Sequence, residues 1–440
     1  MSPAAITSEH RVGTPPTAEP VRAGIVRRFM SGSIVPRTAP GRRFALVAVI
    51  DSLGSGMFYA GSALYFTRVV GLSGAEVGTG LSLAGLLGFL CVIPLGIVAD
   101  KVQAGRVYVG LQLWRAVGYV GYCMVASFPV FVLFACAIGI ADAAVPPISQ
   151  AVVAAAVGAD DRVDTLAKVR AVRNVGFGLG ALLAVGVLQN GSTIAFVALV
   201  AGNAVSFAIA ALLLWKAGVT RLVTVGKSIR KTRPTLVGDA RYIVAALLNG
   251  ALSVHLTLLP LALPLWIALY TNVPIGTFGI LYVLNTVMAV LLQAKFAEPA
   301  DKLKGAVKCS MLAGASLAGF GLVAYLMGQV SLVWLATALA VFAAVLLTFG
   351  EMWQSAGGWT IAYELARPDR RAQYLSTFQM GTTVQAAAAP LLLTTIVLPN
   401  PHGWLMFAGV IALAGVAMSV VVDRAGRHRM YRDRGRHHRK

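Results

Sequence analysis

The chain has 440 residues, of which 58% are hydrophobic and 12% are charged, and its formal charge is +20. Soluble domains carry about 25% charged residues, so this composition excludes an ordinary soluble domain. A charge of +20 raises nucleic acid as a partner, but the positive residues gather in loops and tails, which favours anionic lipid headgroups over nucleic acid.

The first half of the chain predicts a polar tail followed by six membrane spans. Residues 1–43 contain Pro, Thr and Arg without an apolar stretch, which predicts a tail rather than a signal peptide. A helix needs about 20 apolar residues to cross the hydrocarbon of a bilayer. Residues 44–215 supply six such runs, at 44–66, 77–99, 107–127, 129–153, 166–188 and 192–215.

The second half repeats this plan after a basic connection. Residues 216–241 form a long polar loop, and residues 423–440 form an Arg- and His-rich tail for which we expect disorder, because it has no hydrophobic period. Between them, residues 242–422 supply six further runs, at 242–270, 273–294, 306–327, 330–361, 374–397 and 403–422. We therefore predict an all-α integral membrane protein with twelve transmembrane helices in two six-helix halves.

The positive charges alternate between connections. Of the 37 Lys and Arg residues, 33 lie in the two tails and in every second loop, whereas the other loops carry only Arg68 and Glu76. An excess of Lys and Arg in alternate short loops is the positive-inside pattern. It predicts a multi-pass protein of the plasma membrane (the cell's inner membrane) with both termini in the cytoplasm.

A short motif occurs twice, after the second helix of each half. The first copy consists of a Gly, an Asp four residues later, a basic residue, a second Gly and a second basic residue; these are Gly96, Asp100, Lys101, Gly105 and Arg106. Asp301 and Lys302 repeat its central pair 201 residues later. With twelve spans and a central loop, the chain resembles the major facilitator superfamily over about residues 44–422.

The resemblance implies a monomer that works by alternating access, with the motif residues contributing to gating. An Asp near the end of helix 2 can hold the positive N-terminus of a neighbouring helix. The sequence departs from the family's exporter features at two places: helix 5 has Gly176, Gly178, Gly180 and Gly186 but no Gly-Pro pair, and Ala135 stands where many exporters have an Arg. Export and import both remain open at this stage.

Five Asp, Glu, Arg or His residues lie deep within the predicted spans and are the candidates for proton coupling: Asp51, Arg115, Asp142, His255 and Glu351. Arg170 and Arg173 lie near the inner end of their span, from which we expect them to reach towards the cytoplasm. Such groups are costly at bilayer depth and usually have a partner or a function. The resemblance places Asp51 and Asp142 near the pathway, with Arg115 behind them. Movement that changes the distance between a carboxylate and an Arg would bind and release a proton. We take Asp51 as the first candidate for the proton carrier, and the alternative is a static buried ion pair.

The resemblance also places helices 1, 7 and 10 around the substrate. Their aromatic and amide residues, with one amide from helix 11, are the candidates for the substrate cavity: Phe58, Tyr59, Asn249, Trp266, Trp353, Gln354 and Gln379. An aromatic, sparsely charged site would suit an amphipathic or cationic small molecule. The alternative for each aromatic is packing or contact with lipid.

These observations predict a proton-coupled secondary transporter, most simply an efflux protein for drug-like or natural-product compounds. A proton-coupled importer of a small organic solute is the main alternative, and a non-transporting receptor or scaffold is a remote one. The sequence has no phosphate-binding loop, so we expect the proton gradient as the energy source and no cofactor. It also has no nucleophile–base set or metal cluster within the spans, so we do not expect an enzyme.

Overall fold

The computed structural model describes residues 35–221, 239–274, 276–366, 371–400 and 402–437. Most of the predicted N-terminal tail and of the central loop therefore lies outside the described residues. For some residues, including Asp100, Asp301 and residues 424–437, only the backbone is described.

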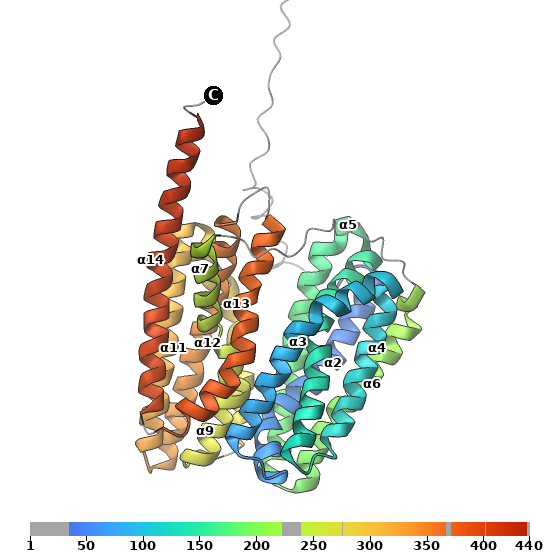
Figure 1. Cartoon of the computed structure of the whole chain (residues 1–440). Helices are drawn as coiled ribbons and strands as arrows, with labels where there is room; N and C mark the ends of the chain where they lie inside the picture. The colour runs from blue at the N-terminus through green and yellow to red at the C-terminus, as the bar shows by residue number, and fades with distance from the viewer. Residues whose placement is uncertain (1–34, 222–238, 275, 367–370, 401, 438–440) are drawn as a thin grey trace, which may run out of the picture.

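The described chain is helical throughout, in two groups that stand side by side (Figure 1). The N-half holds α2 (Ala39–Leu64), the π-helix η1 (Tyr65–Val69), α3 (Gly74–Val102), α4 (Ala104–Tyr122), α5 (Phe128–Asn190), α6 (Thr193–Lys216) and η2 (Val219–Arg221). The C-half holds α7 (Ala240–Leu252), α8 (His255–Thr257), η3 (Leu258–Ala262), α9 (Leu263–Tyr270), α10 (Thr277–Ala297), η4 (Glu298–Asp301), α11 (Leu303–Gln329), α12 (Val333–Glu364), α13 (Arg371–Leu392), η6 (Leu393–Val397) and α14 (Gly403–His437).

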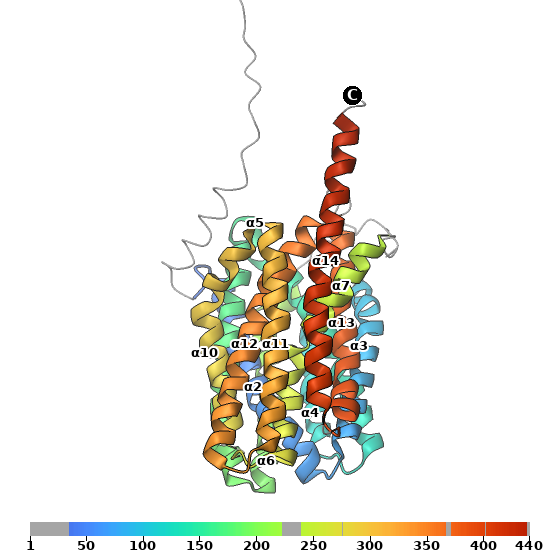
Figure 2. The same cartoon turned by 90° about the vertical axis from the view of Figure 1, so that its left-hand side faces the viewer.

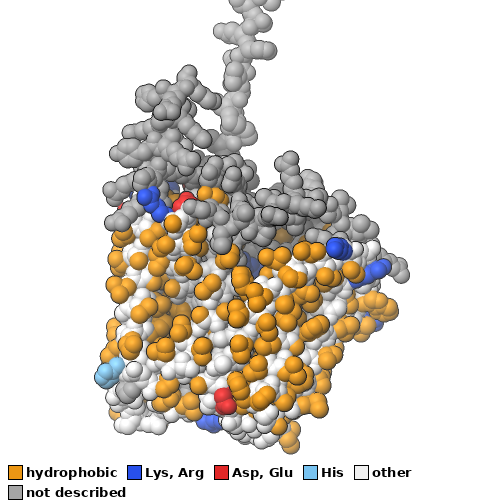
Figure 3. Space-filling model, in the orientation of Figure 1, with side chains coloured by type: hydrophobic (Ala, Val, Ile, Leu, Met, Phe, Trp, Pro, Cys, Tyr) orange, Lys and Arg blue, Asp and Glu red, His pale blue; other side chains and the backbone are white. Residues whose placement is uncertain are grey.

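The predicted twelve-helix membrane fold is confirmed. Ten segments of the described chain are long and apolar enough to cross a membrane, and Thr277–Leu292 is a shorter apolar helix. The remaining predicted span is α4, which is less apolar because it carries Arg106 and Arg115. Figure 3 shows a broad apolar belt, with charged side chains near its upper and lower edges.

The predicted fourth and fifth spans form one continuous helix. α5 passes the segment formed by α2 and η1 twice: Phe131 packs on Phe66 of η1 with ring centroids 4.6 Å apart, and Leu188 lies 3.5 Å from where a Cβ on Gly61 of α2 would be. Between these points, Thr165 approaches the start of α2 at Gly41. The chain therefore reverses direction near Thr165 while its backbone stays helical. The segment between the two spans contains no proline, so nothing there removes the helical hydrogen bonds.

The predicted seventh span is a broken helix. It is divided into α7, α8, η3 and α9, and the Ser253 hydroxyl donates a hydrogen bond to the Asn249 carbonyl at the first break. Pro260 lies in the π-helical turn η3, and Pro264 lies in the first turn of α9. A proline lacks the N–H that would continue the helical pattern, so irregular turns here follow from the sequence.

The two halves pack closely along two pairs of helices. α5 meets α10, where a Cβ on Gly178 would lie 2.8 Å from Thr286 and one on Gly279 would collide with Val185. α3 meets α13, where the N–H of Leu391 donates to the Ser82 hydroxyl oxygen at 3.0 Å. We call the end of the bundle where α2 begins and from which α14 projects the basic end. The α5–α10 and α3–α13 contacts lie in the middle of the bundle and towards the end opposite the basic end.

α14 continues well beyond its predicted span. The helix runs to His437 and projects from the basic end of the bundle (Figure 2). The expectation of a disordered tail after residue 422 is therefore wrong as far as His437. Arg has a favourable helix propensity, and a helix that already exists extends by one residue far more easily than it nucleates.

Candidate functional site

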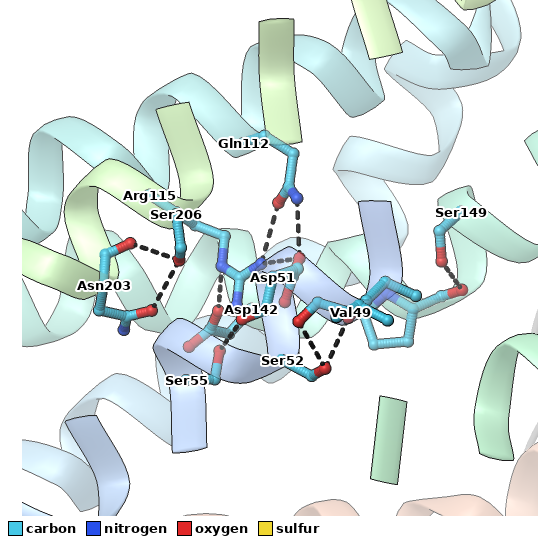
Figure 4. Close-up of polar contacts among 12 residues, drawn as sticks. Val49, Asp51, Ser52, Ser55, Gln112, Arg115, Asp142, Ser149, Asn203 and Ser206 are labelled. Atoms are coloured by element: carbon cyan, nitrogen blue, oxygen red, sulfur yellow. Dashed lines mark hydrogen bonds and ion pairs between the residues drawn. The ribbon is translucent and has the colours of Figure 1, made fainter. Parts of the chain in front are cut away.

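Arg115 joins two carboxylates from separate helices of the N-half (Figure 4). Its Nη1 donates a hydrogen bond of 3.1 Å to Oδ2 of Asp51 on α2, and its Nε lies 2.7 Å from Oδ1 of Asp142 on α5. The contact with Asp142 is an ion pair rather than an aligned hydrogen bond. Arg115 does not lie behind the acidic pair, as we expected from helix 3, but between its members.

Asp51 is the more enclosed of the two carboxylates. Its Oδ2 also accepts a hydrogen bond of 2.8 Å from Nε2 of Gln112, whose Oε1 in turn accepts from Nη1 of Arg115 at 2.9 Å. The Arg115 guanidinium carbon lies 3.7 Å from the ring centroid of Phe207 on α6, a cation–π contact. Asp51, Gln112 and Arg115 thus form a closed triangle of hydrogen bonds that an aromatic ring covers.

Asp142 is more open. Its side chain keeps 29% of its accessible surface, against 10% for Asp51 and 10% for Arg115. Tyr59, half-buried on α2, lies within electrostatic range of Asp142. The exposed guanidinium of Arg173 on α5 acts on Asp142 more weakly than Arg115 does. Of the two carboxylates, Asp142 is the one that water or a ligand can reach.

A second acidic site lies in the C-half. Oε2 of the half-buried Glu351 on α12 accepts a hydrogen bond of 2.8 Å from Nδ2 of Asn285 on α10, which also donates to Thr348 Oγ1 at 3.1 Å. His255 of α8 is buried, and its Nδ1 lies 3.4 Å from the Leu252 carbonyl oxygen. His255 is also within electrostatic range of Glu351. Among the described carboxylates within the spans, Asp142 in the N-half and Glu351 in the C-half are therefore only partly enclosed.

Two pairs of amide and hydroxyl groups join the broken helix to its neighbours. Nε2 of Gln354 donates to Oδ1 of Asn249 at 2.9 Å, so the structure brings these two predicted cavity residues together. Nε2 of Gln385 on α13 donates to Thr257 Oγ1 at 2.8 Å. These buried groups bond to one another across three helices, while Oε1 of Gln385 has no partner among the described residues.

The predicted cavity aromatics fall into separate places. Tyr59 stacks on Phe177 of α5, with ring centroids 5.9 Å apart. Phe58 is buried in an aromatic cluster of the N-half, 4.8 Å from the Tyr119 ring centroid. Trp266 is buried and donates from Nε1 to the Ala324 carbonyl, which fits the packing alternative.

The other two predicted cavity residues lie apart from this aromatic group. Trp353 packs on Phe296 between α12 and α10, with ring centroids 4.3 Å apart. Gln379 is exposed on α13. Of the predicted cavity residues, Tyr59 is the one whose ring stacks beside an acidic group of the N-half.

The first copy of the repeated motif lies at the basic end, where α3 meets α4, and the second copy lies between η4 and α11. A Cβ on Gly105 would collide with the Val219 carbonyl, which accounts for a glycine there, whereas Gly96 has open space around it. Gln103, within the turn, has a φ of 91°, a left-handed conformation that favours glycine. Lys101, Arg106 and Lys302 are exposed, and the side chains of Asp100 and Asp301 lie outside the described residues.

Sequence reasoning missed four polar residues that the structure places beside the candidates. Gln112 precedes Arg115 by three residues, which puts both on one face of a helix, and that spacing was a usable signal. Asn285 and Tyr282 on α10 are also three residues apart. Arg173 had been expected to reach towards the cytoplasm.

A family model described as Major Facilitator Superfamily matches residues 44–390. No curated protein matches the chain. Among solved structures, a mutant form of the nucleoside transporter NupG has a TM-score of 0.72 at 14% identity, covering 88% of this chain and 99% of that one.

Other similar solved structures are named as other transporters. A mutant form of the peptide transporter POT has a TM-score of 0.71 at 15% identity, over 90% of this chain and 97% of that one. A bacterial homolog of the human lysosomal transporter Spinster, in an inward-facing and occupied conformation, has a TM-score of 0.66 at 13% identity, over 93% and 98%. At these identities the likeness shows the fold alone.

Proposed function

The chain belongs to the major facilitator superfamily, and from this membership we propose that it is a proton-coupled secondary transporter that exports amphipathic or cationic drug-like or natural-product compounds. The energy source is the proton gradient, without a cofactor. The protein works by alternating access between its two six-helix halves.

The observation that carries this proposal is the surplus negative charge around Arg115. Asp51 and Asp142 supply two negative charges against the one positive charge of Arg115 in a mostly buried group, and the exposed Arg173 acts on Asp142 more weakly than Arg115 does. A surplus charge in a medium of low polarity is unfavourable until it is neutralised. A proton on Asp142 neutralises it, and so does an organic cation beside Asp142.

Competition at this one position would couple the two fluxes. When a cation binds near Asp142, the carboxylate gives up its proton; when a proton returns, the cation is expelled. Asp51 stays paired with Arg115 and Gln112 throughout, so it holds the arginine in place rather than carrying the proton. Asp142 therefore replaces Asp51 as our candidate for the proton carrier.

The orientation of the protein follows from its charges. We place the basic end in the cytoplasm and the protein in the plasma membrane, in agreement with the positive-inside pattern. The α3–α13 contact near Ser82 then lies on the outer side, which corresponds to an inward-facing arrangement. Such an arrangement would receive a compound from the cytoplasm for export.

Proton flux in everted membrane vesicles tests the proposal. Vesicles that hold an imposed proton gradient are loaded with a pH-sensitive dye, and ethidium is added as the probe. We expect ethidium to dissipate the gradient in vesicles with the wild-type protein but not in vesicles with Asp142→Asn. Exchange of ethidium without proton movement in the wild type would contradict proton coupling.

Import is a second candidate, favoured by the buried amides of the C-half. The Asn249–Gln354 and Thr257–Gln385 pairs offer hydrogen-bonding groups that suit a neutral polar solute. The direction of transport separates the two candidates. Accumulation of a neutral solute in right-side-out vesicles, driven by an inward proton gradient, would favour import.

A further inference from the structure

Three aromatic rings form a line from the N-half to the C-half. Tyr59 of α2 stacks on Phe177 of α5, with ring centroids 5.9 Å apart and an interplanar angle of 26°. Phe177 in turn packs on Tyr282 of α10, with ring centroids 5.8 Å apart and an interplanar angle of 43°. The line therefore crosses the contact between the two halves, where an alternating-access protein changes its shape.

The hydroxyl of Tyr282 has no hydrogen-bond partner among the residues that the structure describes. Tyr282 is 3% exposed, and its oxygen is buried. A buried polar group without a partner destabilises a protein, and buried tyrosine hydroxyls usually find one. The hydroxyl is therefore a hydrogen-bond donor that no other described group of the chain uses.

Tight packing on α10 holds this ring in place. Gly279 lies three residues before Tyr282 and Thr286 four residues after it, so all three share one face of the helix. On that face Gly279 approaches Val185, and Thr286 approaches Gly178. The ring is fixed between two close crossings of α5, which limits how far its hydroxyl can turn to find a partner.

Negative charge lies at both ends of the line. Tyr59 is within electrostatic range of Asp142, which acts on it more strongly than Arg115, Asp51 or Arg173 does. Asn285, one turn along α10 from Tyr282, holds the carboxylate of Glu351. Faces of aromatic rings attract cations, and this attraction grows when water is excluded. Both effects favour a positively charged aromatic molecule over an anion or a sugar.

We propose that Tyr59, Phe177 and Tyr282 form the binding platform for the transported compound, which is an aromatic organic cation that also carries a hydrogen-bond acceptor. The cation lies over the rings between Asp142 and Glu351, and its acceptor receives the hydrogen bond of Tyr282. Because the platform includes residues of both halves, binding would tie ligand occupancy to their relative position. This inference rests on the proposed function and adds the substrate class to it.

Direct binding to the purified full-length protein tests the platform, using two probes. Rhodamine 6G is an aromatic cation with an ester carbonyl, which is an acceptor, and its fluorescence anisotropy reports binding. Tetraphenylphosphonium is an aromatic cation without an acceptor, and it is measured by displacement of rhodamine 6G. From the usual net contribution of a neutral hydrogen bond, we expect Tyr282→Phe to weaken rhodamine 6G binding by about three- to tenfold and to leave tetraphenylphosphonium unchanged.

Phe177→Leu should weaken both probes, because it removes the central ring without removing a hydrogen bond. Tyr325→Phe is the matched control, since Tyr325 lies on α11 beside His402, and it should leave both probes unchanged. Equal affinity of Tyr282→Phe and the wild type for rhodamine 6G would overturn the assignment of the hydroxyl. Failure of both probes to bind the wild type would overturn the platform.

The test also separates this inference from the proposed function. Rhodamine 6G binding that depends on Tyr282 and Phe177, without proton release, would uphold the platform and contradict proton coupling. Proton-coupled transport of another compound that is unaffected by Phe177→Leu would uphold proton coupling and contradict the platform. Thermal unfolding of each variant shows that it is folded, so a loss of binding can be assigned to the ring or the hydroxyl.

Discussion

Nε of Arg115 lies 2.7 Å from Oδ1 of Asp142, and this contact connects α4 with α5 through two residues that are 27 positions apart in the sequence. The same guanidinium is held on its other side by Asp51 and Gln112. The two carboxylates therefore differ in what they can do. Asp51 is enclosed by hydrogen bonds, whereas Asp142 keeps 29% of its side chain accessible.

Neutralising Asp142 should separate transport from the proton gradient. Asp142→Asn resembles the protonated carboxylate, so the protein should fold and exchange a bound cation while losing gradient-driven transport. Exchange and gradient-driven uptake of ethidium in proteoliposomes measure the two activities. Full gradient-driven transport by Asp142→Asn would reject Asp142 as the proton carrier. Glu351→Gln is the companion variant, since it changes the partly enclosed carboxylate of the other half.

Removing Arg115 should destabilise the N-half. Arg115→Leu leaves Asp51 buried with only Gln112 as its partner, and breaking one side of a buried ion pair usually destabilises a protein by about 3–5 kcal/mol. Combining it with Asp51→Asn should restore part of that stability. Unfolding of the detergent-solubilised variants measures both effects. Arg106→Gln changes an exposed arginine of the same helix and should stay within about 0.5 kcal/mol of the wild type.

The small residues of α3 should control closure at the end opposite the basic end. A side chain at Gly78 would collide with Thr394, so Gly78→Leu should push α3 and α13 apart. Spin labels at the exposed positions Thr193 and Asn400 should then report a longer distance between the halves. Gly186→Leu is the control, because a Cβ there meets open space. An unchanged distance in Gly78→Leu would show that this contact does not hold the halves together.

Cysteine labelling tests the orientation. In a background from which Cys91, Cys123, Cys136 and Cys309 have been removed, we expect Thr193→Cys to react with a membrane-impermeant maleimide added outside intact cells. Lys302→Cys, exposed at the basic end, should react only after the membrane is opened. Labelling of Lys302→Cys in intact cells would contradict a cytoplasmic basic end.

The end of α14 should bind lipid without serving transport. A peptide of residues 424–440 should bind phosphatidylglycerol vesicles with about 1 kcal/mol for each basic residue near the surface, and less as salt is added. Ending the chain at Asp423 should leave proton-driven transport within about twofold of the wild type, because the bundle ends there. A folded but inactive truncated protein would give this segment a role beyond lipid contact.

The membrane fold and its two halves could be read from the sequence. Membrane spans are a local property: about 20 apolar residues in a row predict one, and Lys and Arg mark the loops between them. The repeat of Asp100 and Lys101 at Asp301 and Lys302 located the second half in the same way. Local signals could not show that α5 stays helical as it turns, or that α14 continues to His437.

Only the tertiary structure decided which of the intramembrane groups act together. Asp51 and Arg115 are 64 residues apart, and the direction of each side chain depends on how α2, α4 and α5 are rotated against one another. A hydrophobic period does not fix that rotation when a helix is apolar on every side. The sequence therefore named Asp51, Arg115 and Asp142, but the packing alone showed that one arginine serves both carboxylates. The packing also leaves the Asp142 side chain partly accessible and places Tyr282 at the contact between the halves.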